Sequence, residues 1–313
     1  MPEPAGPASG GGARPASIAL VVNPAAAKGR AQTLLPEVAG RLRDTGHAVE
    51  ITLSRTPAEA ADLIRQAAGS GADVLAVMGG DGMAHLGVNA VAEHTATRPD
   101  GPPLALGLVP AGTGNDLARS LGLDPGDVRG ATGALASGTT RPLDLLRVDD
   151  RWVGTVLATG FDALVNARAN RMRRPRGAAR YTVAALAELR TFRPLAYSLV
   201  VDGVPRDLEA MLVAVGNTST YGGGLRICPP ADPYDGWLDV TVIHPVRRAK
   251  LLQLLPQMRT GRFASDPCVE QLRARTVSVS RGAGVAYGDG EELGTTPVTA
   301  TSVPGAIRIC LPA

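Results

Sequence analysis

Two glycine-rich turns contain the residues of this chain whose types and spacing could do chemistry. They read Gly79-Gly80-Asp81-Gly82 and Gly112-Thr113-Gly114-Asn115-Asp116, and each follows directly on an apolar run. Glycine lets a backbone come close to a ligand, and a helix that begins just beyond such a turn offers its positive end to an anion. Two turns of this kind at the ends of neighbouring strands would make one phosphate cradle. The pair therefore predicts a nucleotide site.

The side chains of these turns could add to the cradle. Asp81 could hold a metal ion through water or orient a hydroxyl near phosphate oxygens, although Asp-Gly is also common in turns without a function. Mg²⁺ usually takes one or two carboxylates plus phosphate oxygens, so a single Asp would be enough. Thr113 and Asn115 add side-chain donors. Asp116 is expected to cap the next helix at least as much as to act in catalysis.

A third candidate follows the first apolar run, in the segment Asn23-Pro24-Ala25-Ala26-Ala27-Lys28-Gly29. Asn23 could fix a turn there, and Lys28 could lie near a phosphate. An ordinary connection between a strand and a helix explains the same residues, because such connections are commonly rich in Asn and Pro. The residues alone leave both interpretations open.

Several classes of protein are excluded or disfavoured. No GxxxxGK[ST] motif occurs, which excludes a Walker-type nucleoside triphosphatase, and the glycine spacing misses the dinucleotide fingerprint GxGxxG. A formal net charge of +3 is too mild to suggest a nucleic-acid partner. The cysteines Cys228, Cys268 and Cys310 are scattered and favour a reducing, cytoplasmic compartment. No apolar stretch approaches the roughly 20 residues that span a bilayer.

The elements that must position the turns alternate between strands and helices in the first half of the chain. The expected strands are Ile18–Val22, Val49–Leu53, Val74–Met78 and Leu104–Val109, and the expected helices lie near Ala31–Asp44, after Thr56, near Met83–Glu93 and near Asn115–Leu121. Such alternation predicts a parallel sheet with helices on its faces. Ligands bind beyond the carboxyl ends of the strands of such a sheet, which is where both glycine turns fall.

From about Leu143 strand-like runs dominate. They are Asp144–Val148, Val153–Ala158, Ala196–Val201, Glu209–Gly216, Leu238–Ile243, Thr276–Ser280, Val285–Tyr287 and Ala306–Leu311, with helices near Asp162–Arg173, Arg180–Arg190 and Val246–Arg259. This pattern predicts a mostly antiparallel β domain, either a sandwich or an open barrel. We therefore divide the chain into a disordered tail at 1–16, an α/β domain at 17–142 and a β domain at 143–313.

Five motifs in a fixed order make the sequence recognisable. They are Asn23-Pro24, Gly79-Gly80-Asp81-Gly82, Pro110-Ala111-Gly112-Thr113-Gly114-Asn115-Asp116-Leu117-Ala118-Arg119, Asp235-Gly236-Trp237-Leu238-Asp239 and Asp289-Gly290-Glu291. Over about residues 18–311 the chain resembles the diacylglycerol kinase catalytic-domain family, the soluble lipid kinases of bacteria together with sphingosine and ceramide kinases. The resemblance implies a Rossmann-like α/β domain of the NAD-kinase and diacylglycerol-kinase type and a β-sandwich domain, with ATP in the cleft between them.

The resemblance also implies roles for individual residues. The nucleotide would be bound by Asn23, Thr56, Gly79, Gly80, Asp81, Gly82, Gly112, Thr113, Gly114 and Asn115. Glu291 matches the general base, and Asp289 and Asp81 match carboxylates of a water network around Mg²⁺. From the residues alone, Asp289-Gly290-Glu291 would be only a hairpin turn. The Asp235 carboxylate and the carbonyl groups of Asp232 and Trp237 match a structural metal site.

Two departures from the family pattern bear on activity. Met83 stands where the family usually has Thr or Ser, and Ala26-Ala27 stand where Ser-Gly is usual, so two phosphate contacts are lost. Retention of Asp81, Thr113 and Glu291 argues against an inactive enzyme.

A basic cluster between Arg168 and Arg180 lies beside the apolar segment Tyr181–Leu189. It could dock on anionic lipid headgroups, or it could be a solvated face.

The sequence thus predicts an ATP- and Mg²⁺-dependent kinase that phosphorylates a lipid hydroxyl, with diacylglycerol as the favoured acceptor. A sphingoid base, phosphatidylglycerol or a polyprenol is an alternative acceptor. A non-catalytic nucleotide or lipid sensor on the same fold is the alternative from another class. The expected setting is cytoplasmic, with the lipid substrate met at the membrane surface through peripheral contact. A nucleic-acid partner is not expected, and a homodimer is left open.

Overall fold

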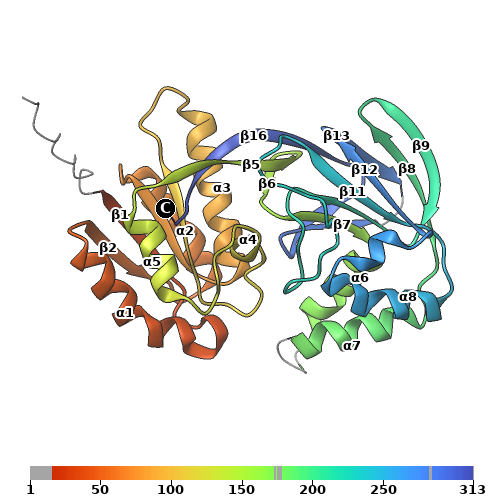
Figure 1. Cartoon of the computed structure of the whole chain (residues 1–313), viewed down its shortest axis with the longest axis horizontal. Helices are drawn as coiled ribbons and strands as arrows, with labels where there is room; N and C mark the ends of the chain where they lie inside the picture. The colour runs from red at the N-terminus through yellow and green to blue at the C-terminus, as the bar shows by residue number, and fades with distance from the viewer. Residues whose placement is uncertain (1–15, 173, 175–177, 282–283, 313) are drawn as a thin grey trace, which may run out of the picture.

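The computed structural model describes residues 16–172, 174, 178–281 and 284–312, and Figure 1 shows an α/β half and a β-rich half. Four parallel strands begin the first sheet: β1 (Ser17–Val22), β2 (Ala48–Leu53), β3 (Val74–Gly79) and β4 (Ala105–Pro110). They lie in the order β2-β1-β3-β4, so their carboxyl ends share one edge. Every residue of β3 and β4 is buried, as expected for strands covered on both faces.

Helices cover both faces of these four strands. They are a short 3₁₀ helix (Ala26–Gly29), α1 (Arg30–Asp44), α2 (Pro57–Gly69), α3 (Asp81–Thr97), α4 (Asp116–Ser120) and α5 (Val128–Ala136). Ala31, Val38 and Leu42 of α1 join Ala131 and Leu135 of α5 in one apolar cluster, and buried apolar residues of α2, α3 and α4 join another. The start of α2 follows the capping signal in the sequence, because the Thr56 hydroxyl accepts the N–H of Glu59 at 3.1 Å and Pro57 takes the first helical position.

Two long strands connect the halves of the molecule. They are β5 (Thr140–Val148) and β16 (Val298–Cys310), and Figure 1 shows both running from one half into the other. β16 pairs in parallel with β4 and antiparallel with β5, so the end of the described chain returns to the sheet of the α/β half. The expected boundary between residues 142 and 143 falls inside β5, and the division into domains stays a prediction.

The β-rich half is a sandwich of two sheets. Its further strands are β6 (Arg151–Val153), β7 (Val156–Gly160), β8 (Leu195–Val201), β9 (Val204–Ala210), β10 (Leu212–Gly216), β11 (Leu238–Ile243), β12 (Val269–Ala274), β13 (Thr276–Arg281), β14 (Val285–Gly288) and β15 (Glu291–Thr295). The first sheet continues as β16-β13-β8-β9, and the second runs β12-β11-β10-β7-β14-β15. Side chains of both sheets, among them Leu199 and Val240, form one buried cluster. The predicted fold class is confirmed, and of its two alternatives the sandwich is right.

Three helices pack on the outer face of the second sheet: α6 (Phe161–Arg171), α7 (Ala178–Leu189) and α8 (Arg248–Leu254). Short 3₁₀ helices at Leu255–Arg259 and Arg262–Ser265 follow α8. Apolar residues of α6, α7 and α8 share one cluster with Leu212 and Ile243 of the sheet. Among the described residues, no helix combines the length and the apolar character needed to cross a membrane.

The sequence pattern missed α5, β12 and β15. It also merged β6 with β7, in the expected strand Val153–Ala158, and β9 with β10. The run Glu209–Gly216 was expected as one strand, but β9 ends at Ala210 and β10 begins at Leu212. β9 pairs with β8 in the first sheet, whereas β10 pairs with β7 and β11 in the second. The chain therefore passes from one sheet to the other at Met211, a change of partner that leaves no break in local hydrophobicity.

Candidate active site

The two glycine turns touch at the carboxyl edge of the parallel strands. The carbonyl oxygen of Gly79 accepts the backbone N–H groups of Ala111 at 2.7 Å and Gly112 at 3.0 Å. A Cβ on Gly112 would fall 2.3 Å from the Cα of Gly80, so only glycine fits at this contact. The turns expected at the ends of neighbouring strands are therefore in direct contact.

The Asp81 carboxylate ties the first turn to the second. Its Oδ2 atom accepts the backbone N–H of Asn115 at 2.9 Å, and its Oδ1 atom accepts that of Asp116 at 2.6 Å. Asp81 is also the first residue of α3, so the bond fixes the start of that helix. Each carboxylate oxygen retains acceptor capacity beyond these bonds. Asp81 is thus placed for the predicted role near phosphates while it also holds the two turns together.

Asn115 does less for a ligand than the sequence suggested. Its amide exchanges two hydrogen bonds with Gly112, from Gly112 N to Oδ1 at 3.0 Å and from Nδ2 to the Gly112 carbonyl at 2.9 Å. The Asn115 side chain is buried and its backbone is left-handed, with φ at 57°. The amide therefore braces the turn, and Thr113, which is exposed at the tip, offers the freer side chain.

Asn23 and Thr56 lie at the same edge of the sheet. The Cβ of Asn23 is 3.7 Å from the point where a Cβ on Gly79 would be, and the Asn23 side chain accepts the N–H of Ala25 at 3.1 Å. Asn23 thus stands beside the first glycine turn and fixes its own loop. Thr56 follows the neighbouring strand, but its hydroxyl is used as the cap of α2.

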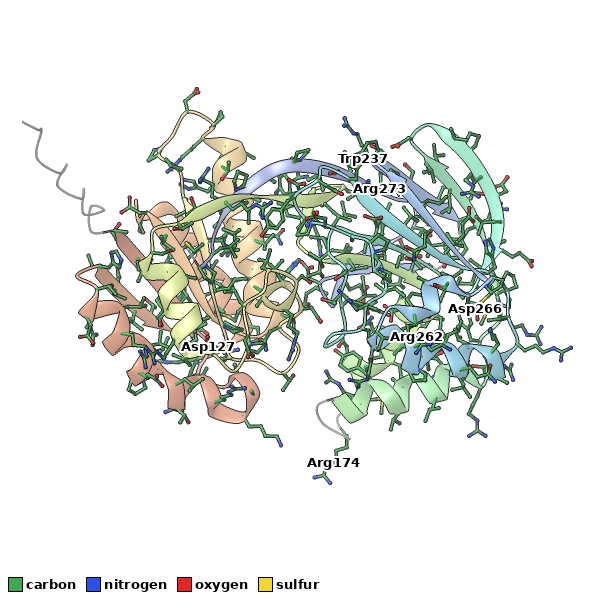
Figure 2. The ribbon with its side chains drawn as sticks, viewed as in Figure 1. Asp127, Arg174, Trp237, Arg262, Asp266 and Arg273 are labelled. Carbon is green, nitrogen blue, oxygen red and sulfur yellow. The ribbon has the colours of Figure 1, made fainter. Side chains whose placement is uncertain are left out.

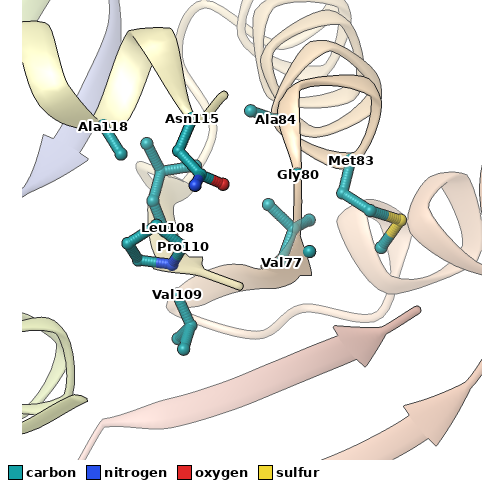
Figure 3. A pocket seen from close by; sticks show the side chains of 10 residues that line it. Val77, Gly80, Met83, Ala84, Leu108, Val109, Pro110, Asn115 and Ala118 are labelled. Atoms are coloured by element: carbon teal, nitrogen blue, oxygen red, sulfur yellow. The ribbon is translucent and has the colours of Figure 1, made fainter. Parts of the chain in front are cut away.

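A small apolar pocket lies under the glycine turns. Figure 3 shows its lining side chains from β3, α3 and β4, among them Val77, Leu108 and Met83. Met83 is buried and folds over Gly79, where a Cβ would fall 2.4 Å from the Met83 Cγ atom. The side chain that replaces the usual hydroxyl therefore packs into the domain, and it offers no polar atom at this turn.

The Asp289-Gly290 turn joins β14 to β15 as a two-residue hairpin, with φ of 53° and 84°. The buried Asp289 carboxylate accepts hydrogen bonds from His85 Nδ1 at 2.9 Å, Gly154 N at 3.0 Å, Thr155 N at 2.8 Å and Thr155 Oγ1 at 2.6 Å. Burial alone would raise the pKa of Asp289, but the hydrogen bond and charge of His85 and the other donors hold it below its ordinary value. With four donors, Asp289 is saturated and acts by holding its neighbours.

Glu291 lies beside the first turn of α3. Its Oε1 atom is 3.7 Å from the point where a Cβ on Gly82 would be, although residues 82 and 291 come from opposite halves of the molecule. The Glu291 side chain is exposed, and none of the described residues donates a hydrogen bond to its carboxylate. The structure therefore brings the predicted base to the phosphate turns and leaves its carboxylate free.

His85 is a site residue that the sequence reasoning missed. It lies four residues after Asp81 on α3, and it contacts the same turn that carries Glu291. Helical spacing contained the signal, because residues four apart on a helix share a face. His85 could therefore have been predicted as a site residue, because it shares a face of α3 with Asp81.

The sequence suggested that Asp116 caps the helix α4, but in the structure it does not. The N-cap position is taken by Asn115, and the Asp116 carboxylate instead accepts the N–H groups of Gly223 at 2.8 Å and Gly224 at 2.7 Å. Burial and the charge of Asp81 raise the pKa of Asp116 to about 6. The residue therefore links the phosphate turn to a loop of the β-rich half.

The residues expected to hold a structural metal ion do not fit one as they stand. The Asp235 carboxylate accepts the backbone N–H of Trp237 at 3.0 Å on one oxygen and pairs with the Arg273 guanidinium on the other. Figure 2 shows Arg273 beside Trp237. The guanidinium would repel a second cation at the same carboxylate. The backbone carbonyl oxygen of Asp232, the atom expected to coordinate the ion, accepts the N–H of Asp235 at 3.4 Å.

A metal ion that arrives with a nucleotide is a different case, and the phosphate turns fit one. Mg²⁺ needs only one or two carboxylates when phosphate oxygens and water complete its shell. Asp81 keeps acceptor capacity at the turns and Glu291 is free beside them. The Asp81 carboxylate could therefore serve Mg²⁺ when nucleotide is bound, while the Glu291 carboxylate stays free to accept a proton.

Comparison with known proteins shows similarity over nearly the whole chain. Residues 17–148 match the family described as diacylglycerol kinase catalytic domain, and residues 155–311 match the YegS C-terminal NAD kinase beta sandwich-like domain. A protein of Mycobacterium tuberculosis named diacylglycerol kinase is 38% identical over 301 residues, which are 94% of this chain and 95% of the relative. A protein of Stenotrophomonas maltophilia named "Probable lipid kinase YegS-like" is 28% identical, with 89% and 92% covered.

The fold is shared with a solved structure as well. A crystal structure of a diacylglycerol kinase from Bacillus anthracis str. Sterne superimposes with a TM-score of 0.75 and 22% identity, over 94% of this chain and 96% of that one.

Proposed function

The chain belongs to the diacylglycerol kinase family of lipid kinases, and on that premise we propose that it transfers the γ-phosphoryl group of ATP to the hydroxyl of diacylglycerol. The observation that supports this most directly is the approach of Glu291 to the first turn of α3. A nucleotide held by the glycine turns and a lipid hydroxyl held near Glu291 would meet at this place, where the two halves of the molecule come together.

The phosphate turns would bind and orient the nucleotide. Backbone N–H groups at the start of α3 and in the second glycine turn would contact its phosphates, and the positive end of α3 adds to the attraction. Asp81 would keep the two turns at a fixed separation through its bonds to Asn115 and Asp116. When bound, Mg²⁺ would neutralise charge on the phosphates.

Glu291 would accept the proton of the lipid hydroxyl as its oxygen attacks the phosphorus atom. An alcohol is a poor nucleophile at neutral pH, so a carboxylate within hydrogen-bonding reach of it raises the rate. Asp289 would not touch the reactants, because its four donors already occupy its carboxylate. This refines the role implied by the family resemblance: Asp289 would position the turn and Glu291 would act on the substrate.

The test is transfer of γ-³²P from ATP to a panel of lipids in mixed micelles, with Glu291→Gln as the control. Label on diacylglycerol that the variant transfers roughly a hundredfold or more slowly would support the whole proposal. Label on a sphingoid base, phosphatidylglycerol or a polyprenol would keep the kinase and change the acceptor. ATP binding without transfer to any lipid would favour the nucleotide sensor.

We also propose that the enzyme meets its substrate on an anionic membrane surface, through α7 and α8. Val183 and Leu186 on α7 and Leu252 on α8 are 44%, 50% and 42% exposed, and the two helices share one apolar cluster beneath. The exposed arginines Arg171 and Arg174 precede α7 and Arg190 directly follows it, and none of them forms an ion pair among the described residues. Figure 2 shows Arg174 projecting away from the protein at this end.

The predicted basic cluster is only partly available for this role. Arg168 pairs with Glu188, and Arg173 and Arg176 lie outside the described residues. The remaining charges complement an anionic bilayer, where each contributes about 1 kcal/mol.

Vesicles of phosphatidylcholine with and without phosphatidylglycerol test the proposed surface. Replacing Arg171, Arg174 and Arg190 by Ala should weaken binding to the anionic vesicles. Replacing Arg43, Arg98 and Arg129, which are exposed on the α/β half, makes the same change in charge and should weaken binding less. Equal binding by both triple variants would contradict the proposed surface.

A further inference from the structure

The turn that carries Glu291 is held by several groups of the β-rich half. Asp289 accepts hydrogen bonds from Gly154 and Thr155, and the Arg151 guanidinium donates to the carbonyl oxygen of Glu292 at 2.9 Å. Within the part of the chain that the structure describes, one hydrogen bond reaches residues 289–292 from the α/β half. It comes from His85.

His85 and the phosphate turn belong to one helix. Gly82 and His85 are three residues apart on α3 and lie on the same side of it. The His85 Nδ1 atom meets Asp289 Oδ2 at 2.9 Å, while Glu291 Oε1 lies 3.7 Å from the point where a Cβ on Gly82 would be. The helix therefore carries both the end of the phosphate turn and the group that holds the turn of the base.

The surroundings of His85 fix its ring and its proton. Because the ionised Asp289 carboxylate can only accept, His85 Nδ1 carries the hydrogen. The Asn89 amide donates to the carbonyl oxygens of His85 and Trp152, both at 2.9 Å, which anchors this stretch of α3 to β6.

The charges around the ring favour the imidazolium. Burial lowers the pKa of His85, and the charge of Arg151 lowers it slightly more. The hydrogen bond and charge of Asp289 and the charge of Glu291 raise the pKa by more than these two effects lower it. The ring thus faces two carboxylates and one guanidinium, and its pKa lies above the ordinary value of 6.5.

We infer that His85 is a positioning residue for Glu291. Through its hydrogen bond to Asp289, His85 holds the turn that carries Glu291 beside the first turn of α3. The inference rests on the proposed function, in which Glu291 takes the proton of the lipid hydroxyl. No described residue donates to the Glu291 carboxylate, so its place depends on the groups that hold its neighbours. His85 fixes that place relative to α3, which begins in the first glycine turn, whereas the other donors to Asp289, Gly154 and Thr155, belong to the β-rich half itself.

A purely structural contact between the two halves would explain the same hydrogen bond. The two roles differ in their dependence on Glu291. A structural contact supports the rate whether or not the base is present, whereas a positioning residue acts only through the base. A pair of substitutions that act through one step is not additive.

The experiment measures phosphoryl transfer to diacylglycerol by His85→Gln in the wild type and in Glu291→Gln. We expect kcat to fall about tenfold or more in the wild-type background, because a general base contributes roughly a hundredfold or more and part of this is lost on displacement. The KM for ATP should change less than about twofold, and the residual rate of Glu291→Gln should not change. His94→Gln, the same substitution near the other end of α3, should match the wild type.

Equal losses in both backgrounds, or a wild-type kcat in His85→Gln, would overturn the inference. A second measurement does not need the lipid. Hydrogen–deuterium exchange over residues 288–293 should be faster in His85→Gln than in the wild type or His94→Gln, and equal rates would also overturn it. A wild type that labels no lipid would contradict the proposed function, while the exchange rates would still decide whether His85 holds the turn.

Discussion

Gly80 and Gly112 approach so closely that a Cβ on Gly112 would lie 2.3 Å from the Cα of Gly80. The same Cβ would meet the Asn115 Oδ1 atom at 2.9 Å. Both neighbours are held in place, Gly80 by the start of α3 and Asn115 by its bonds to Gly112 and Asp81. Neither Gly80 nor Asn115 can therefore move away to make room for a Cβ on Gly112.

Gly112→Ala should for this reason both destabilise the protein and weaken ATP binding. We expect a loss of about 1–3 kcal/mol in the free energy of unfolding, as for overpacked sites. Gly133→Ala is the matched control, because Gly133 lies within α5 and a Cβ there meets nothing within 4 Å. That variant should be more stable by about 0.5–1 kcal/mol. Thermal unfolding with and without ATP measures both effects, and equal behaviour of the two variants would contradict the packing argument.

Asp289 should control the titration of His85. Replacing it by Asn removes the charge that raises the pKa of His85, so the imidazole should titrate at a lower pH in Asp289→Asn. Because the folded pKa is raised, His85 stabilises the wild type most below pH 6.5, and that contribution is lost as the pH rises through the raised value. NMR of the ring protons measures the titration. Asp150→Asn, a change at an exposed turn, should leave it unaltered.

The sequence predicted most of the α/β half because its elements are locally encoded. Three of its strands, β1, β3 and β4, are short apolar runs, β2 alternates apolar and polar residues, and the start of α2 carries its cap in Thr56 and Pro57. The β-rich half was harder. Met211 separates strands of two different sheets, and only the pairing partners, which are distant in sequence, reveal the break.

The residues of the candidate site also divide into those that a local motif reveals and those whose role depends on partners distant in sequence. The glycine turns and Glu291 were found through motifs, and the structure brings Glu291 to Gly82. His85 lies in no motif, because its importance comes from Asp289, 204 residues away. Asp116 was misjudged for the same reason, since its partners are the N–H groups of Gly223 and Gly224.

Asp162 should make stability depend on pH. It lies in the first turn of α6, where its carboxylate accepts the Tyr221 hydroxyl at 2.7 Å and the Asn166 amide at 3.1 Å, and desolvation raises its pKa from 3.8 to about 6. A raised carboxyl pKa means that the folded state binds a proton more tightly, so this contribution to stability is present at low pH and is lost as the pH rises through about 6.

Between about pH 8 and about pH 5 the gain from Asp162 should be about 1.4 kcal/mol. Asp162→Asn keeps an acceptor for Tyr221 and removes the titration, so its stability should rise less than that of the wild type over this range. Denaturant unfolding at several pH values measures the difference. The same slope in both proteins would show that Asp162 does not titrate there.

Arg273 should make the Asp235 turn independent of divalent cations. The guanidinium pairs with Asp235, and its Nε atom lies 4.0 Å from the Oδ1 atom of the buried Asp239, whose Oδ2 atom has no hydrogen-bond partner among the described residues. Asp239 and Arg273 are also opposite residues of β11 and β12, so the backbone register holds the guanidinium between the two carboxylates. A fixed positive charge at this place supplies the neutralisation that a metal ion would otherwise give.

Removal of that charge should create a demand for a cation. In Arg273→Met we expect a lower melting temperature that Mg²⁺ or Ca²⁺ partly restores, because two carboxylates are left without their counter-charge. Adding Asp235→Asn should abolish the restoration, and the wild type should show no cation effect that depends on Asp235. Thermal unfolding with chelator and with each ion decides the matter. A wild-type stabilisation by Ca²⁺ that Asp235→Asn removes would show instead that the ion displaces the guanidinium, as the family resemblance implies.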